Sequence, residues 1–407
     1  MDRLQQTLEE VLMDAPYQVF AEMLAKRLAS QGVVLTARER QKLIEHVKSV
    51  TTDTFSLRKW WRFGQDIDIE VTEEEIEELN EQFSELLEHK LPGLIRSTID
   101  DLSSDILHTL KLNWSTELRR QNHKRRDFEK SLHKQWGLGI DRLRMFLTVA
   151  REFGELTNSS LRNEQDINSP VLIDILTRLH ARGCQVTEEI LCLMSAGLAD
   201  GAMARWRTLH EIAVVALFLK EHGEDSAIRY TDHEIVESFR AACDYEACCE
   251  RLGYEPMSKS EFEKARQAYD HVIKIHGLPF KAPYGWAAGA PGVKNPSFQE
   301  IEKKVGIDHL RAHYRIASHN IHGNPKGVFF KLGLVDESAC LLAGPSNTGL
   351  ADPGHSAAVS LLQISTALGL IKPNLDVLVI LRILARLTDE VGEALGDAHQ
   401  YLEGDIS

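Results

Sequence analysis

The stretch GAMARWRTLHEIAVVALFLKE, residues 201–221, predicts a long amphipathic helix and indicates an α-helical fold. Met203, Val214 and Phe218 fall on one face of this helix at three- and four-residue spacing. Arg207 and Glu211 share that face, and we expect them to pair because an unpaired buried charge is costly. The pair is either an intrahelical ion pair in the core or a pair that reaches across a bundle to orient a histidine.

Helical periodicity continues on both sides of this stretch, from Ile140 to the end of the chain. We expect helices near 140–158, 168–182, 185–199, 201–222, 225–252, 259–277, 298–304, 308–322, 355–371 and 375–403. Gly183, Gly223 and Gly253 lie between these segments and predict helix ends. The predicted fold class is therefore all-α, a multi-helix bundle.

The segment 278–297, LPFKAPYGWAAGAPGVKNPS, predicts a long loop between two of these helices. Loops of this length in a compact domain are often functional or mobile. One hypothesis is therefore a small-molecule or nucleotide-binding protein in which this loop acts as a lid.

The first 135 residues predict a smaller, mostly helical region, in which Pro16 separates two helices. Apolar and acidic residues alternate over 66–71, which predicts one short β-strand. Trp136-Gly137 and Gly139 predict a boundary, so we expect domains at 1–135 and 136–407. Two capping boxes are expected at helix starts, Thr36 with Glu39 and Thr72 with Glu75.

A run of basic residues lies at 119–134 and could contact phosphates, or could form a solvated helix face. Acidic residues close on both sides favour the solvated face. The run consists of Arg119, Arg120, His123, Lys124, Arg125, Arg126, Lys130 and Lys134.

Composition limits the class of protein. The formal net charge is −14 over 407 residues, so any nucleic-acid binding must come from a local basic patch. The six cysteines form no C-x-x-C pair, which is typical of reduced thiols in a cytosol. The N-terminus predicts no signal peptide, and the most apolar tracts are too short to span a bilayer. We therefore expect a soluble, cytoplasmic protein without a membrane partner.

The stretch DHLRAHYRIASHNIHGNPKG, residues 308–327, concentrates the chemistry of the chain. A histidine titrates near neutral pH and can act as general acid or base. An arginine can form a bidentate pair with two phosphate oxygens. Together they suit metal-independent RNA cleavage, with RNA as the expected partner. The alternative is a buried hydrogen-bonded network that holds this helix to its neighbours.

The candidate site residues follow from this stretch and from the 201–222 helix. The candidate catalytic residues are His322, Arg315, Ser318, Glu211 and Arg207. The candidate substrate-binding residues are Arg311, His319, Tyr314, Asn324 and Lys326. Glu211 or Arg207 would reach the Ser318 and His322 face and orient His322.

Cofactor and metal motifs are absent from the sequence. There is no G-x-x-x-x-G-K-[ST] loop, no G-x-G-x-x-G after a strand and no H-E-x-x-H. Asp232, His233, Glu234 and Glu237 are better interpreted as an exposed helix face than as metal ligands. We expect neither a cofactor nor a bound metal.

The chain from about Trp136 to the 380s resembles an uncharacterised prokaryotic all-α family, one of the domains of unknown function. The resemblance is carried by these segments: LTRLHARGCQ (176–185), GLADGAMARWRTLHEIAVVALFL (197–219), Tyr284-Gly285-Trp286, HLRAHYRIASHNIHGNPKG (309–327) and AGPSNTGLADPGH (343–355).

The wider pattern, a helical bundle in which Arg and His close a helix, resembles the HEPN superfamily. Arg315 and His322 match its R-x4–6-H motif, whereas Arg205 and His210 match it mid-helix and are interpreted as coincidence. The resemblance implies a metal-independent ribonuclease that acts as a dimer with paired motifs, often as a toxin or in antiphage defence.

Two hypotheses of different class follow. The first is a HEPN-like homodimeric ribonuclease with His322 as acid/base and Arg315 as phosphate clamp. The second is a non-catalytic helical binding protein whose Arg/Glu/Ser/His cluster is structural. A solvent-reachable site, or a dimer contact that joins two His322 side chains, favours the first, and a fully buried, fully paired cluster favours the second.

Overall fold

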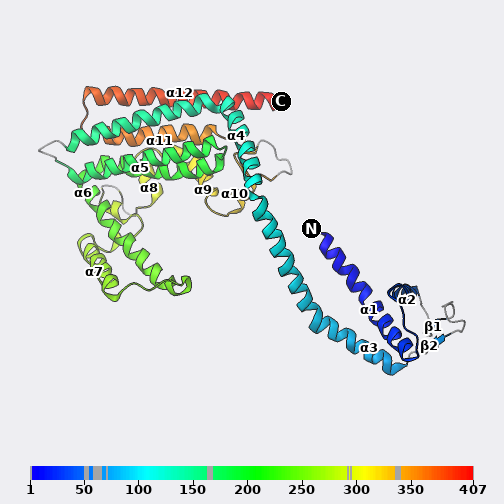
Figure 1. The fold of residues 1–407 in the computed structure, drawn as a ribbon. Helices are drawn as coiled ribbons and strands as arrows, with labels where there is room; N and C mark the ends of the chain where they lie inside the picture. Colours follow the sequence, from blue (N-terminus) through cyan, green and yellow to red (C-terminus); the bar gives the residue numbers. More distant parts are fainter. Residues whose placement is uncertain are drawn as a thin grey trace. The chain divides into compact units, whose positions relative to one another are not determined.

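The chain is all-α, as predicted, in a computed structural model that describes residues 2–49, 55–57, 67–69, 72–162, 168–290, 293, 296–334 and 341–406. It forms two compact units, Met1–Arg120 and Gln121–Ser407. The division falls inside one helix, α4 (Leu91–Arg162), and not at Trp136–Gly139, where the sequence predicts it (Figure 1). Trp136 is fully buried in the core of the second unit, so that part of α4 belongs to the bundle.

The first unit contains short helices and one hairpin. Leu24, Leu28 and Leu43 form a small core between α1 and α2. Pro16 lies inside α1 and does not divide it, contrary to prediction. The elements are α1 (Asp2–Ser30), α2 (Ala37–Ser49), β1 (Phe55–Leu57), β2 (Ile67–Ile69), α3 (Glu73–Glu85), a π-helical segment (Leu86–Lys90) and the start of α4.

Local sequence signals in this unit are confirmed. Thr36 and Glu39 cap α2, with the backbone N–H of Thr36 donating to Glu39 Oε2 at 2.9 Å. The equivalent bond of Thr72 to Glu75, at α3, is also 2.9 Å. β2 falls within the predicted strand 66–71 and pairs antiparallel with β1.

The second unit is a bundle of long helices with smaller helices at one side. Figure 1 shows the C-terminal part of α4, α5, the first half of α6, α11 and α12 running side by side. Its elements after α4 are α5 (Pro170–Ser195), α6 (Ala199–Leu252), α7 (Lys259–His276), α8 (Phe298–Lys304), α9 (Arg311–His319), α10 (Pro325–Phe329), α11 (Ala351–Gly369) and α12 (Leu375–Ile406).

The first half of α6 occupies the centre of the bundle core. Met203, Val214 and Phe218 are buried, as the sequence predicts. Trp206 is also fully buried, and its indole N–H lies 3.0 Å from both the backbone oxygen of Ser356 and the hydroxyl of Ser360. These contacts attach α6 to α11.

Glycines have two different roles in the bundle. Gly223 (φ 76°) interrupts α6 and Gly253 (φ 71°) ends it, as predicted, because both adopt a backbone conformation that disfavours other residues. Gly183 instead lies inside α5, where an added Cβ would sit 2.9 Å from Ile364 of α11. The predicted break at Gly183 is therefore wrong, because this glycine permits close helix packing.

The segment 278–290 is packed against α6 and is not an open lid. It forms two 3₁₀ turns, Leu278–Lys281 and Gly285–Gly289, in which Phe280 and Trp286 are buried. The guanidinium of Arg229 donates to the backbone oxygens of Trp286 at 3.0 Å and Gly285 at 3.1 Å. The predicted loop therefore contains two 3₁₀ turns that hydrogen bonds from Arg229 attach to α6.

None of the described helices is both long enough and apolar enough to cross a membrane.

We expect Gly285→Ala to lower the free energy of unfolding by about 1–3 kcal/mol, because the new methyl group would collide with the backbone carbonyl of Phe280. Gly396→Ala is the matched control, since an added Cβ there meets no atom within 4 Å. In the helix interior of α12 it should be neutral or stabilising by up to about 1 kcal/mol. Urea denaturation measures both, and equal stabilities would contradict the packing described for this segment.

His180 predicts a pH dependence of stability. It is buried in α5, with its Nε2 3.1 Å from the Ser365 hydroxyl, and burial lowers its pKa to about 4. An unfolded histidine binds a proton below about pH 6.5. Stability should therefore fall as the pH drops from 6.5 to 4, by about 3 kcal/mol from this group.

The double variant His180→Leu/Ser365→Ala tests this, since it removes both partners and leaves neither polar group unsatisfied. Its free energy of unfolding, measured at several pH values between 4 and 7, should vary less steeply than that of the wild type. Parallel curves would show that His180 does not titrate in this way.

Candidate functional site

The helix that carries the candidate site residues, α9, is shorter than predicted. It runs over Arg311–His319 after a 3₁₀ turn at Asp308–Leu310, so His322 lies beyond its end. The next helix, α10, starts soon afterwards because Asn324 caps it, accepting a bond of 2.9 Å from the N–H of Gly327. Tyr314 and Ala317 of this segment are buried, whereas Ile321, beyond the end of α9, is exposed.

Tyr314 connects α9 to α6. Its hydroxyl donates to Glu211 Oε1 at 2.6 Å. Glu211 Oε1 also lies 3.2 Å from Arg207 Nε. The Arg207 guanidinium lies over the Tyr314 ring, 4.9 Å from its centroid. Burial, and then the bond to Glu211, raise the pKa of Tyr314, so the hydroxyl stays protonated and remains a donor.

Glu302 of α8 is the centre of a second, deeper group. Its two oxygens accept from His210 Nε2 at 2.7 Å and from Arg311 Nη1 at 2.9 Å. The side chains of His210 and Glu302 are fully buried. Burial lowers the pKa of His210, so we assign a neutral imidazole that donates through Nε2.

Aromatic rings join the two groups. Phe298 of α8 stacks on Tyr314 with 4.9 Å between ring centroids. The Arg311 guanidinium lies 5.2 Å from the Tyr314 centroid, in addition to that of Arg207, so two cations contact one ring. Tyr284 of the 278–290 segment is near enough for Glu211 to raise its pKa, although burial is the larger cause. We call these residues the α6–α9 cluster: Arg207, His210, Glu211, Tyr284, Phe298, Glu302, Arg311 and Tyr314.

The structure brings together only some of the predicted site residues. Arg207, Glu211, Arg311 and Tyr314 meet in the cluster. The expected approach of Glu211 or Arg207 to His322 is replaced by their contact with Tyr314.

The other predicted residues make local contacts or are exposed. Ser318 bonds to the backbone oxygen of Tyr314 at 2.8 Å, which is a local helix contact. His319 Nδ1 and Asn324 Nδ2 are 3.0 Å apart. Arg315, His322 and Lys326 are exposed, and Lys326 lies over the Phe330 ring.

The sequence hypotheses distinguish a solvent-reachable site from a fully buried and fully paired cluster, and this cluster has features of both. Glu302 and His210 are buried and paired, whereas the side chains of Arg207 and Arg311 retain 24% and 26% exposure. Sequence reasoning missed Glu302, because nothing local marks one glutamate among the charges of the 298–304 helix. Arg205 pairs with Glu189, and His210 bonds to Glu302 in the cluster.

The exposed residues of α9 and α10 belong to a segment without carboxylates. No Asp or Glu occurs between Asp308 and Asp336, in a chain whose formal net charge is −14. The segment holds four Arg or Lys and four His: Arg311, Arg315, Lys326, Lys331, His309, His313, His319 and His322. Charge patterning along the sequence is the signal that identifies it.

The 119–134 run differs from this segment, because several of its charges are paired with carboxylates close by in the sequence. Arg120 bonds to Glu117 at 2.7 Å, and His123 and Lys130 lie within 4.0 Å of Asp127. The run is exposed, as expected for a solvated face.

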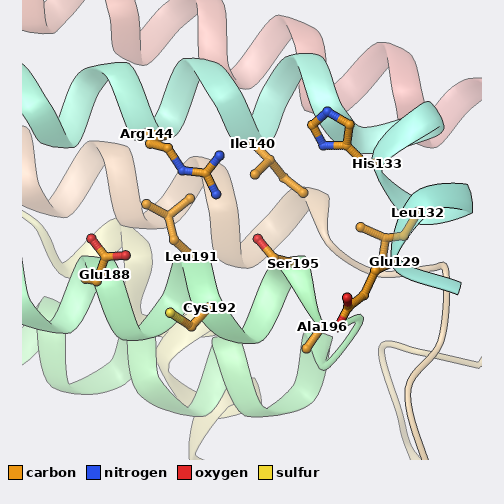
Figure 2. A pocket seen from close by; sticks show the side chains of 10 residues that line it. All are labelled: Glu129, Leu132, His133, Ile140, Arg144, Glu188, Leu191, Cys192, Ser195 and Ala196. Carbon is orange, nitrogen blue, oxygen red and sulfur yellow. The ribbon is translucent and has the colours of Figure 1, made fainter. Parts of the chain in front are cut away.

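A pocket of about 440 Å³ lies between α4 and α5, away from the predicted residues. Figure 2 shows Arg144 and His133 of α4 across from Glu188, Cys192 and Ser195 of α5. Its charges already have partners outside the pocket, with Arg144 3.1 Å from Asp141 and Glu188 2.9 Å from Arg151. The spacing of 188, 192 and 195 on one helix face was the available sequence signal.

Among the described residues, no group of three or more His, Cys, Asp or Glu side chains is placed to hold a metal ion. The interpretation of Asp232 and His233 as an exposed face is wrong for His233, which is buried. Its Nε2 lies 2.9 Å from the backbone oxygen of Ala282, and Asp232 binds His276 at 2.7 Å. His233 therefore contacts the 278–290 segment, and Asp232 contacts the last residue of α7.

Residues 173–338 match the model of a family of unknown function, DUF5677. The matched range contains the whole α6–α9 cluster, α10 and the 278–290 segment. No curated protein and no solved structure matches the chain.

The Tyr314–Glu211 bond can be tested for a structural role by a double-mutant cycle. Tyr314→Phe should destabilise the protein by about 1–2 kcal/mol, because Glu211 loses a charge-assisted donor. Combined with Glu211→Gln, the losses should be non-additive by at least about 0.5 kcal/mol. Tyr401→Phe, at an exposed tyrosine, is the control and should change the free energy of unfolding by less than about 0.5 kcal/mol. Additive losses would show that the bond contributes nothing.

Proposed function

We propose that this protein binds RNA through the exposed face of α9 and α10. The observation that carries the proposal is the carboxylate-free segment between Asp308 and Asp336, with Arg315, His322 and Lys326 on the surface. Affinity for nucleic acid comes mainly from Lys and Arg that neutralise phosphates. In an acidic chain such a contact needs a local patch of this kind.

The finer proposal is metal-independent cleavage of the bound RNA. His322 would remove the proton of a ribose 2′-hydroxyl, which attacks the adjacent phosphorus and expels the 5′-oxygen, while Arg315 stabilises the charge on the phosphoryl oxygens. The protonated His322 would return its proton to the expelled 5′-oxygen, so the products would be a 2′,3′-cyclic phosphate and a 5′-hydroxyl. The resemblance to HEPN ribonucleases supports this assignment, with a toxin or antiphage role in the cytoplasm.

In this proposal Glu211 and Arg207 are positioning residues. They act on α9 through Tyr314, whose hydroxyl and ring they contact. The exposure of Arg315 and His322 is compatible with a homodimer in which two copies of the motif meet.

The second candidate function is a non-catalytic interaction protein. It is favoured by the pairing inside the α6–α9 cluster, where Glu211 bonds to Tyr314 and Glu302 bonds to His210 and Arg311. Groups that are occupied in this way stabilise the fold and are not free to act on a substrate.

The deciding experiment measures RNA binding and RNA cleavage by the purified full chain in EDTA. Fluorescence anisotropy with a labelled RNA should show at least tenfold weaker binding for Arg315→Glu and Lys326→Glu. The slope of log K against the logarithm of the salt concentration should become shallower by about one in each of these two variants, because each loses one phosphate contact. Arg382→Glu, at an exposed arginine of α12, makes the same charge change elsewhere and should bind within twofold of the wild type.

His322→Ala separates binding from cleavage. Cleavage that is lost in a folded His322→Ala with unchanged affinity supports the ribonuclease. Binding without cleavage by the wild type supports RNA binding alone. The RNA proposal is overturned if the wild type does not bind RNA, or if Arg315→Glu and Arg382→Glu lose equal RNA affinity. Either result leaves the non-catalytic interaction protein.

A further inference from the structure

The ring of His319 is held at the end of α9 by a contact with the next helix. His319 Nδ1 lies 3.0 Å from Asn324 Nδ2. Asn324 is the N-cap of α10, and its Oδ1 accepts a hydrogen bond of 2.9 Å from the backbone N–H of Gly327. Gly327 is buried against the backbone oxygen of His319, with which an added Cβ would collide. The two short helices therefore meet through Asn324 and Gly327, and His319 is part of that contact.

These contacts determine which nitrogen of His319 carries the ring proton. A backbone N–H can only donate, so the Asn324 atom that it reaches is the amide oxygen, and the other amide atom is the nitrogen, a donor. His319 Nδ1 must then accept from Asn324 Nδ2, because two donors do not bond to each other. A neutral imidazole carries one proton, which here lies on Nε2. His319 therefore presents an N–H donor through Nε2.

The Nε2 nitrogen of His319 is free to meet a ligand. The contact with Asn324 is the single side-chain hydrogen bond of His319 within the part of the chain that the structure describes. His319 Nε2 is also not one of the enclosed polar atoms that lack a partner, as His210 Nδ1 is, so water or a ligand can reach it. A donor of fixed direction is thus open at the end of α9.

Arg315 lies one helical turn before His319 on the same side of α9. Residues four apart on a helix are surface neighbours, with about 5–6 Å between their Cβ atoms. Arg315 is exposed, and no carboxylate pairs with it among the residues whose positions are described. An unpaired guanidinium beside an imidazole N–H is a set of donors that fits the oxygens of one phosphate group.

We propose that His319 donates from Nε2 to the same RNA phosphate that Arg315 binds, and that Asn324 is the positioning residue that keeps the ring proton on Nε2. This inference rests on the proposed RNA binding and adds a second contact to that phosphate. The two histidines of this region then have different roles. His322 exchanges protons in the proposed reaction, whereas His319 only donates a hydrogen bond.

The RNA affinity of the full chain, measured by fluorescence anisotropy in EDTA, tests the phosphate contact. His319→Phe keeps a ring but removes both nitrogens, and it should weaken binding roughly tenfold, as expected for the loss of one hydrogen bond to a charged group. His319→Gln should bind within about threefold of the wild type, because its amide oxygen can accept from Asn324 and its N–H can donate outward. His271→Phe, at an exposed histidine of α7, is the matched control and should bind like the wild type. Circular dichroism should show equal helix content in all of them.

Asn324→Ser tests whether Asn324 acts through His319. Serine still caps α10, since its hydroxyl also accepts from a backbone N–H, but it has no amide donor for His319 Nδ1. Asn324→Ser alone should weaken RNA binding severalfold, and it should have little further effect in a His319→Phe background. Equal effects in both backgrounds would show that Asn324 contributes only to the fold.

The ring proton itself has a spectroscopic test that needs no RNA. In Asn324→Asp the carboxylate can still cap α10 but can only accept, so the proton of His319 should move from Nε2 to Nδ1. NMR of the full chain with ¹⁵N-labelled histidine, at about pH 9 where histidine is mostly neutral, distinguishes the two tautomers by their nitrogen chemical shifts. The signal of His319 is identified by its loss in His319→Gln. A proton that remains on Nε2 in Asn324→Asp would overturn the role of Asn324.

Failure of this inference differs from failure of the proposed function. RNA binding that is lost in Arg315→Glu but unchanged in His319→Phe overturns the His319 contact and leaves RNA binding in place. A wild type that binds no RNA overturns both, whichever nitrogen carries the proton.

Discussion

Burial of Trp206 is the constraint on which the bundle unit depends. The indole is fully buried, and its N–H reaches Ser356 and Ser360 of α11. Its ring lies 5.3 Å from that of His210, which holds Glu302. One side chain therefore connects the central helix to the bundle on one side and to the α8–α9 region on the other.

This arrangement separates the two faces of α9. The inner face carries Tyr314 and Ala317 and is committed to packing against α6. Around this face Arg207 pairs with Glu211 of α6 and Arg311 pairs with Glu302 of α8, and this pairing offsets part of the cost of their desolvation. The outer face keeps Arg315 in water, and the chain beyond the helix keeps His322 there as well.

Exposure has a different meaning in the two units. In the bundle the exposed groups of α9 and α10 include the cationic side chains of Arg315 and Lys326 as well as the apolar side chains of Val328 and Phe329. Along the first part of α4 the exposed groups include a continuous row of isoleucine and leucine, which water solvates poorly.

Much of the fold was predictable from local sequence. The all-α class, the two capping boxes and the break at Gly223 each depend on residues within a few positions of one another. The wrong predictions concern residues whose role depends on a distant neighbour. Gly183 was predicted to end a helix but allows α11 to approach α5. Trp136 was predicted to mark a boundary but is a buried core residue.

The predictions for the candidate site also divide into those that rest on local sequence and those that depend on distant neighbours. The sequence alone determined which residue types are concentrated in 308–327, and that Arg207 and Glu211 share a helix face, because helical spacing is local. Only the tertiary structure decided their partners. Glu211 bonds to Tyr314, 103 residues away, and His210 to Glu302, 92 residues away. Contacts of that separation depend on how helices pack, and the periodicity of a single helix carries no information about which neighbour it meets.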